Sequence, residues 1–176
     1  LEDRVGNVKV TGDARLRYKD AEHAKSKFDA RARVQFNAKV NDRTDAVVRL
    51  TSGNFELGNS ENEDKADATI DRAYVNHKFG ERVSAKAGRF GQSFGGGLMF
   101  DGTFDGAQLN VGNDKINVQA AYGYMVSGDN GRIVANNTNG NELTKDQNVT
   151  NTYIGLTGKV GKHTMVGGFY DRVNQD

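Results

Sequence analysis

Basic side chains recur at every second position along several segments of the chain. Between Val8 and Tyr18, each polar residue is charged or hydroxylic and lies between residues that are apolar or small. Rows of Arg and Lys attract anions and orient dipolar solutes along an aqueous path. Alternatively, the arginines pair with carboxylates such as Asp13, Asp29 and Asp45 and only keep a wall wet, and both effects can coexist. The basic residues expected on this polar face are Lys9, Arg15, Arg17, Arg31, Arg33, Lys39, Arg49 and Lys86, and Arg72 is added where the alternation is weak.

The alternation that places these residues predicts β-strands with one apolar and one wet face. Residues 28–40 repeat the pattern, with Phe28, Val34 and Phe36 among the apolar positions. The alternating runs extend for about 11–13 residues, whereas strands of soluble proteins are mostly about 5–6 residues long. A strand that spans a membrane in a β-barrel needs about 9–11 residues. The pattern therefore predicts an all-β fold, a transmembrane antiparallel β-barrel.

The predicted connections between strands alternate between short and long. Short turns are expected at 41–43, 80–81, 112–114 and 161–162, and longer segments at 19–27, 53–66, 92–103 and 127–149. Outer-membrane barrels show this rhythm, with short periplasmic turns and longer extracellular loops. The strands themselves are expected at 7–18, 28–40, 44–52, 67–79, 82–91, 104–111, 115–126, 150–160 and 163–172.

The nine predicted strands bear on domain organisation, because antiparallel closure in bacterial barrels requires an even number. We therefore expect residues 7–176 to be the N-terminal portion of an incomplete porin-like barrel, and residues 1–6 to be the end of a stalk or linker. The alternative is that one strand is split or missed, for example within 127–149.

A second candidate site is the glycine-rich, partly apolar segment that follows Gly88. A loop lying in water would not be expected to gather so many apolar side chains. If the loop folded inward against the barrel wall, these side chains would be buried, and the glycines would permit the tight bends. Such a loop would narrow a pore; the alternatives are a packed surface loop or a contact between subunits. The expected constriction residues are Arg89, Phe94, Met99, Phe100 and Asp101.

Composition excludes several other functions. The net charge of +1 gives no basic excess for nucleic acid as a partner. The absence of cysteine removes disulfides, thiolate metal sites and cysteine nucleophiles. The three histidines form no visible ligand set, and no nucleophile motif is present. We therefore expect no enzymatic activity, no metal and no cofactor.

Four segments, 10–18, 31–36, 71–75 and 87–90, resemble general bacterial porins, and most closely the OmpM-type porins of diderm Firmicutes. The resemblance covers essentially the whole chain. It implies a homotrimer of 16-stranded pores in the bacterial outer membrane, in contact with membrane lipid, with the loop after Arg89 folded into the barrel. In that family an S-layer-homology domain and a coiled-coil stalk precede the barrel.

The resemblance implies passive diffusion of small hydrophilic solutes, with anions favoured if the basic residues line the pore. Outer-membrane tethering would depend on the N-terminal domain, which these residues do not include, and the third loop is shorter than in general porins. The competing hypothesis is a surface or secreted β-protein that binds acidic polysaccharide through its Arg-rich face. A requirement for detergent distinguishes the two, because only the barrel should need it.

Overall fold

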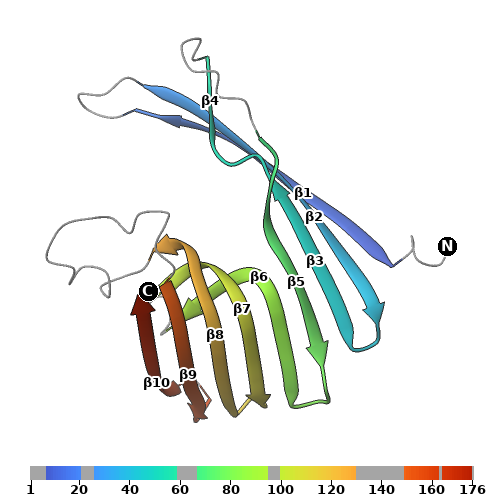
Figure 1. The fold of residues 1–176 in the computed structure, drawn as a ribbon, viewed down its shortest axis with the longest axis vertical. Helices are drawn as coiled ribbons and strands as arrows, with labels where there is room; N and C mark the ends of the chain where they lie inside the picture. Colours follow the sequence, from blue (N-terminus) through green and yellow to red (C-terminus); the bar gives the residue numbers. More distant parts are fainter. Residues whose placement is uncertain are drawn as a thin grey trace, which may run out of the picture. The chain divides into compact units, whose positions relative to one another are not determined.

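The computed structural model describes residues 7–20, 26–58, 67–94, 100–129, 149–162 and 164–175, and almost all of them are in β-strands (Figure 1). No helix in these ranges is long and apolar enough to cross a membrane. The all-β class expected from the alternation is confirmed. The strands are β1 (Val8–Lys19), β2 (Lys27–Asn41), β3 (Thr44–Thr51), β4 (Phe55–Leu57), β5 (Thr69–Lys78), β6 (Val83–Phe94), β7 (Phe100–Gly112), β8 (Ile116–Asp129), β9 (Val149–Val160) and β10 (Thr164–Gln175).

The strands pair in chain order, as expected for an antiparallel meander. The order is β1-β2-β3-β5-β6-β7-β8-β9-β10, and only β4 lies off this path, paired with β2. All nine predicted strands are present. The additional strand, β4, lies in the segment 53–66 that was expected to be a loop, where Phe55 pairs with Ala30 and Leu57 with Phe28. A three-residue strand is too short for a period of two to be visible in the sequence.

The described chain forms two compact units. The first comprises residues 1–40 and 45–73, and the second residues 41–44 and 74–176. In the first unit, β1 and β2 pair over twelve positions, from Val8 opposite Ala38 to Lys19 opposite Lys27. Directly opposed residues project from the same face, and the face alternates along each strand. The register therefore gathers the odd-numbered, mostly polar residues of β1 and β2 on one face and the even-numbered, mostly apolar residues on the other.

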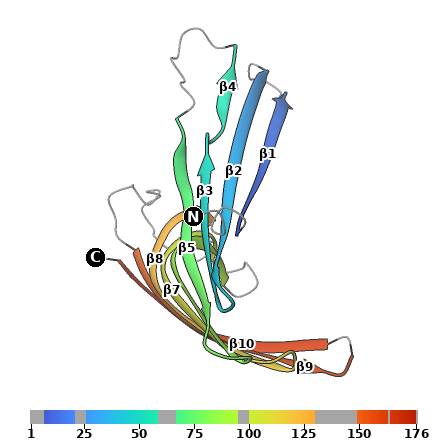
Figure 2. The same cartoon turned by 90° about the vertical axis from the view of Figure 1, so that its right-hand side faces the viewer.

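The second unit has a core of aromatic side chains on one face of its sheet. Phe90 lies opposite Phe104 in the β6–β7 register, and Phe90, Phe94 and Phe104 are 1%, 0% and 0% exposed. The rings of Phe94 and Tyr153 stack with their centroids 4.3 Å apart, and Tyr74 packs against the group. We call these five residues the aromatic cluster. Figure 2 shows that the strands of this unit are bent along their length.

Two glycines allow β7 and β8 to approach closely where the cluster lies. Gly106 is directly opposite Gly123 in the β7–β8 register. A Cβ atom on Gly106 would overlap the backbone of Tyr122 and Gly123, and one on Gly123 would overlap the backbone of Asp105 and Gly106. Neither position can therefore accept a side chain without a shift of the neighbouring strand.

The expected loop at 92–103 is shorter than the sequence suggested. Strand β6 continues to Phe94 and β7 begins at Phe100, with Ser93 paired to Asp101 and Phe94 to Phe100. Phe94, Phe100 and Asp101 are therefore in strands rather than in a loop. The burial of Phe94 against Phe104 and Tyr153 accounts for the extension of the strand. This burial stabilises strand geometry in a segment whose glycines disfavour strand formation.

Several predictions concern residues outside the described ranges. These are the stalk or linker at 1–6, Met99 within 95–99, and most of the long segment 127–149. At the start of that long segment, β8 extends three residues beyond its expected end, to Asp129.

Candidate functional site

The polar face of the first unit concentrates guanidinium groups. Arg15 lies directly opposite Arg31 in the β1–β2 register, and Arg33 lies two residues further along β2. Like charges in directly opposed positions destabilise a sheet. Because Arg15 and Arg31 nevertheless lie opposite each other on a wet face, the stability of the strands does not account for arginine at these two positions. We call the face that carries Arg15, Arg31, Arg33 and Arg49 the basic face.

Carboxylates balance only part of this charge. Asp13 lies 2.9 Å from Nη2 of Arg33 and 3.7 Å from Nη2 of Arg31, so one acid serves two bases. At the other end of β1, Arg17 donates to Asp29 at 2.6 Å, and Lys19 lies 3.5 Å from the same carboxylate. Ion pairs as exposed as these contribute little to stability, so their effect is mainly to fix where the charges lie.

Arg49 of β3 extends the basic face and is held by a carboxylate that the sequence analysis did not single out. Its Nε and Nη2 atoms donate to the two oxygens of Asp71 on β5, the shortest contact being 2.6 Å. This two-point geometry fixes the orientation of the guanidinium plane. Arg72 instead donates to the backbone oxygen of Asp71 at 2.7 Å. The weak alternation of residues 69–78 hid the role of Asp71.

The basic face encloses a hollow of about 190 Å³, lined by Thr11, Gly12, Asp13, Arg33, Gln35 and Arg49. Asp13 and Asp71 pair with arginines of this face, and this group of six described residues, four arginines and two carboxylates, has a formal charge of +2. Arg15 donates to Asn54 at 2.7 Å, but the Nε atoms of Arg15 and Arg31 are enclosed and have no hydrogen-bond partner in the structure. The arginines are therefore partly paired, and this group of described residues retains excess positive charge. That they attract anions stays a prediction.

The remaining basic residues are distributed more widely. Lys9 and Lys39 are exposed near the short-turn ends of β1 and β2. Lys86 belongs to the second unit, and its Nζ lies 5.2 Å from the ring centroids of both Tyr74 and Phe90. It therefore makes cation–π contacts with the aromatic cluster. The structure brings together Arg15, Arg31, Arg33 and Arg49 within the first unit, and Lys86 belongs to the second.

The described residues expected at a constriction all lie in the β6–β7 hairpin, where Phe94 is directly opposite Phe100. Arg89 lies within β6 on the face opposite Phe90, and its guanidinium forms a 2.6 Å ion pair with Asp105, directly opposite on β7. Phe94 is in the aromatic cluster, whereas Phe100 and Asp101 begin β7. Asp105 was missed because its pairing with Arg89 follows from the hairpin register, which the glycine-rich segment between the strands obscured.

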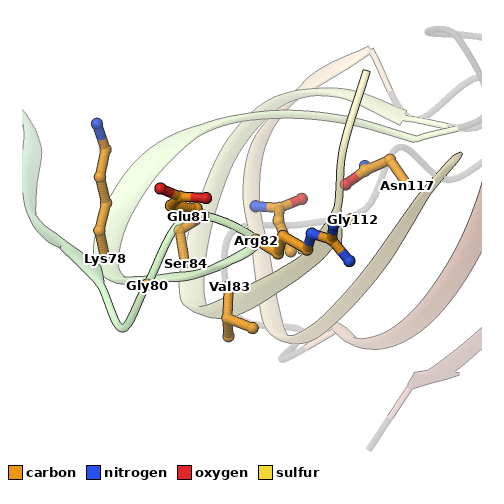
Figure 3. A pocket seen from close by; sticks show the side chains of 9 residues that line it. Lys78, Gly80, Glu81, Arg82, Val83, Ser84, Gly112 and Asn117 are labelled. Carbon is orange, nitrogen blue, oxygen red and sulfur yellow. The ribbon is translucent and has the colours of Figure 1, made fainter. Parts of the chain in front are cut away.

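A second hollow, of about 160 Å³, lies in the second unit where β5–β6 and β7–β8 meet their short turns (Figure 3). Lys78, Glu81 and Arg82 contribute charges of both signs, and none of these side chains is buried. Within the described ranges, no group of three or more histidine and carboxylate side chains is placed to hold a metal ion. We assign no chemistry to this hollow.

The described geometry defines a class of protein: an antiparallel all-β chain with long strands, a wet charged face and an exposed apolar face. A comparison with protein-family models identifies the class independently, since residues 3–169 match the family described as "Putative porin". The chain belongs to this family. A search of curated proteins finds none that matches it.

Membership of this family supports a porin-like transport function in general and indicates a protein embedded in the outer membrane. It favours the transport hypothesis over the polysaccharide-binding alternative.

Proposed function

We propose that this porin allows small hydrophilic solutes to diffuse passively and that its basic face favours anions. The observation that carries the proposal is the surplus of guanidinium charge on Arg15, Arg31, Arg33 and Arg49 over Asp13 and Asp71. The hollow beside Arg33 and Arg49 leaves these groups open to water and ions.

The physical basis is electrostatic and does not require a tight binding site. Fixed positive charge along a water-filled path raises the local concentration of anions and lowers that of cations. At about 0.15 M salt the Debye length is about 8 Å, so charges on a narrow wall are only partly screened. The pairing of Arg33 with Asp13 and of Arg49 with Asp71 restrains the guanidinium groups. The path beside the wall therefore stays open, while the wall retains its positive charge.

The opposite face of the same strands supports a lipid-facing wall. Leu16 and Val10 on β1 are 65% and 57% exposed, and Val34 on β2 is 40% exposed. Near the long connection between β1 and β2, the rings of Tyr18 and Phe28 pack with centroids 4.9 Å apart. Aromatic residues at the membrane interface are typical of outer-membrane barrels. In the proposed orientation, the long connections face the cell exterior and the short turns face the periplasm.

The OmpM-type affiliation is a proposal that rests on the resemblance alone. It implies that the chain works as a homotrimer and that a preceding peptidoglycan-binding domain in the parent protein tethers the outer membrane. Purified parent protein should then sediment with isolated peptidoglycan, whereas residues 1–176 alone should remain in the supernatant. Sedimentation of both proteins, or of neither, would contradict the tethering proposal.

Channel formation is tested by adding the full-length protein in detergent to a planar lipid bilayer. We expect stepwise, ohmic conductance and, in a salt gradient, a reversal potential of the sign that anion permeation produces. Liposome swelling with neutral sugars of increasing size measures passive diffusion separately from charge selectivity. Absence of conductance from protein that shows heat-modifiable migration, as folded barrels do, would refute the proposal.

A further inference from the structure

The aromatic cluster lies on the face of the second unit that also carries polar side chains. Asn110 of β7 and Gln119 of β8 lie directly opposite each other on this face. The other face carries apolar residues such as Leu109 and Ile154, which are 42% and 50% exposed. In the proposed function, that apolar face is turned toward the membrane and the face of the cluster toward the water of the pore.

One aromatic ring on this polar face is open to solvent. Phe169 of β10 lies beside Tyr153, with the two rings at 26° and their centroids 6.0 Å apart. Tyr153 in turn stacks on Phe94 at 27° and 4.3 Å. Exposure rises along this row of rings, since Phe94 is 0%, Tyr153 is 7% and Phe169 is 49% exposed. The two buried rings therefore support the outer ring and leave about half of it accessible.

A glycine makes room for the row of rings. Gly155 of β9 lies directly opposite Phe169, and a Cβ atom at residue 155 would overlap the side chain of Tyr153. The Tyr153 side chain therefore lies over Gly155, next to Phe169. On its other side, Gly155 lies directly opposite Gln119 of β8. Phe169 and Gln119 thus flank the position of Gly155 on one face of the sheet.

Hydrogen-bonding groups lie beside the open ring. Asp171, two residues after Phe169, is directly opposite Tyr153 and projects from the same face. The Asn151 side chain, which is 1% exposed, donates to Oδ1 of Asp171 at 2.5 Å and so holds the carboxylate in place. A carboxylate accepts several hydrogen bonds, and the amide of Gln119 offers both a donor and an acceptor.

We propose that Phe169, Asp171 and Gln119 form a subsite for neutral sugars in the pore. The inference rests on the proposed function and deepens it by naming a class of solute. A pyranose presents C–H groups on its flat faces and hydroxyl groups around its edge. The C–H groups pack on the Phe169 ring, while hydroxyl groups exchange hydrogen bonds with Asp171 and Gln119. Because a neutral sugar carries no charge for the basic face to act on, this subsite supplies an affinity that net charge cannot.

The test measures ion current through the full-length protein in planar bilayers while maltose is added. A bound sugar obstructs the path, so we expect the current to fall with maltose concentration until the subsites are filled. Polyethylene glycol of similar mass controls for viscosity and excluded volume, and its effect should not saturate. F169A should raise the half-blocking concentration of maltose by roughly fivefold, because the ring contact is lost. D171N should raise it by a smaller factor.

Further variants separate stacking from general apolarity. F169L keeps an apolar side chain without a flat ring and should behave like F169A, whereas F169W should retain the block. The matched control Y170A removes a ring that is 60% exposed on the opposite face, and should leave the block unchanged. Heat-modifiable migration checks that each variant assembles, and F169L replaces F169A if the latter does not.

Three results would overturn the sugar subsite. These are equal block of the wild type and F169A, loss of block in Y170A to the same degree as in F169A, and equal effects of maltose and polyethylene glycol. Conductance without a saturable effect of maltose refutes the subsite alone. Absence of conductance from assembled protein refutes the proposed function itself.

Discussion

Replacing Arg31, Arg33 and Arg49 with Gln should move the channel toward cation preference. Among the described residues, the four arginines of the basic face and the carboxylates of Asp13 and Asp71 together have a formal charge of +2. The triple substitution leaves Arg15 with Asp13 and Asp71, a formal charge of −1. Gln keeps a polar side chain at each position, so the wet face and the backbone pairing of β1, β2 and β3 should be retained.

The expected size of the effect follows from Coulomb's law with screening. One unit charge about 10 Å from the ion path produces about 18 mV in water, reduced to about 5 mV at ~0.15 M salt. Three charges therefore contribute about 15 mV, which changes the ratio of anion to cation permeability by roughly threefold. In a tenfold salt gradient the reversal potential should shift by roughly 20 mV toward the cation value.

The assay is the reversal potential of channels in planar bilayers, with assembly checked by heat-modifiable migration. The matched control removes the same number of basic groups from short turns, as the substitutions R43Q, K115Q and K162Q. Its reversal potential should change by much less than that of the first variant. If the two triple variants shift equally, or if correctly assembled R31Q/R33Q/R49Q channels show no shift, the arginines are not in the permeation pathway.

Three further predictions concern facing, strand packing and topology. V34R should impair membrane insertion, because residue 34 is the eighth of the fifteen in β2 and an Arg at the lipid midplane costs about 2–4 kcal/mol. The control R33V, on the other face of the strand, should assemble. Equal yields of folded protein from the two variants would show that the faces are misassigned. G106A should lower the urea midpoint of unfolding, because the added Cβ overlaps the backbone of Tyr122 and Gly123. The control G168A should not lower it, because a Cβ at residue 168 meets no heavy atom within 4 Å. Equal midpoints for the two variants would exclude close packing at Gly106. S26C, before β2, should react with an impermeant thiol reagent on intact cells, whereas D42C in a short turn should not; labelling of D42C alone would invert the proposed orientation.

Most of the basic face could be predicted from the sequence because β1 and β2 bury neither face completely and alternate cleanly. In β1 and β2, parity alone assigns Arg15 and Arg31 to the same side, and the observed register requires the same. In β5 the alternation fails between Ile70 and Ala73, so parity could not reveal that Asp71 holds Arg49.

The second unit was harder to predict because apolar residues occur on both of its faces. Ala87 and Phe90 are both apolar yet belong to opposite faces of β6, so composition does not identify the buried side. Only the cross-strand partners decide it: Phe90 meets Phe104, and Arg89 meets Asp105. Such pairings depend on hairpin register, which a glycine-rich connection leaves undetermined in the sequence.

In the proposed pore, the sharing of Asp13 between Arg31 and Arg33 makes the selectivity of the wall easy to alter in small evolutionary steps. The β1–β2 ladder is joined by twelve registered backbone positions, and the shared carboxylate is an exposed addition to it. Loss of the acid would raise the charge of the wall by one unit, and loss of either arginine would lower it by one. Single nucleotide changes could therefore move a lineage between solute preferences while the scaffold remains unaltered. Related channels exposed to different nutrients should differ at Asp13, Arg31 and Arg33 before they differ in the residues that pair the backbones of β1 and β2.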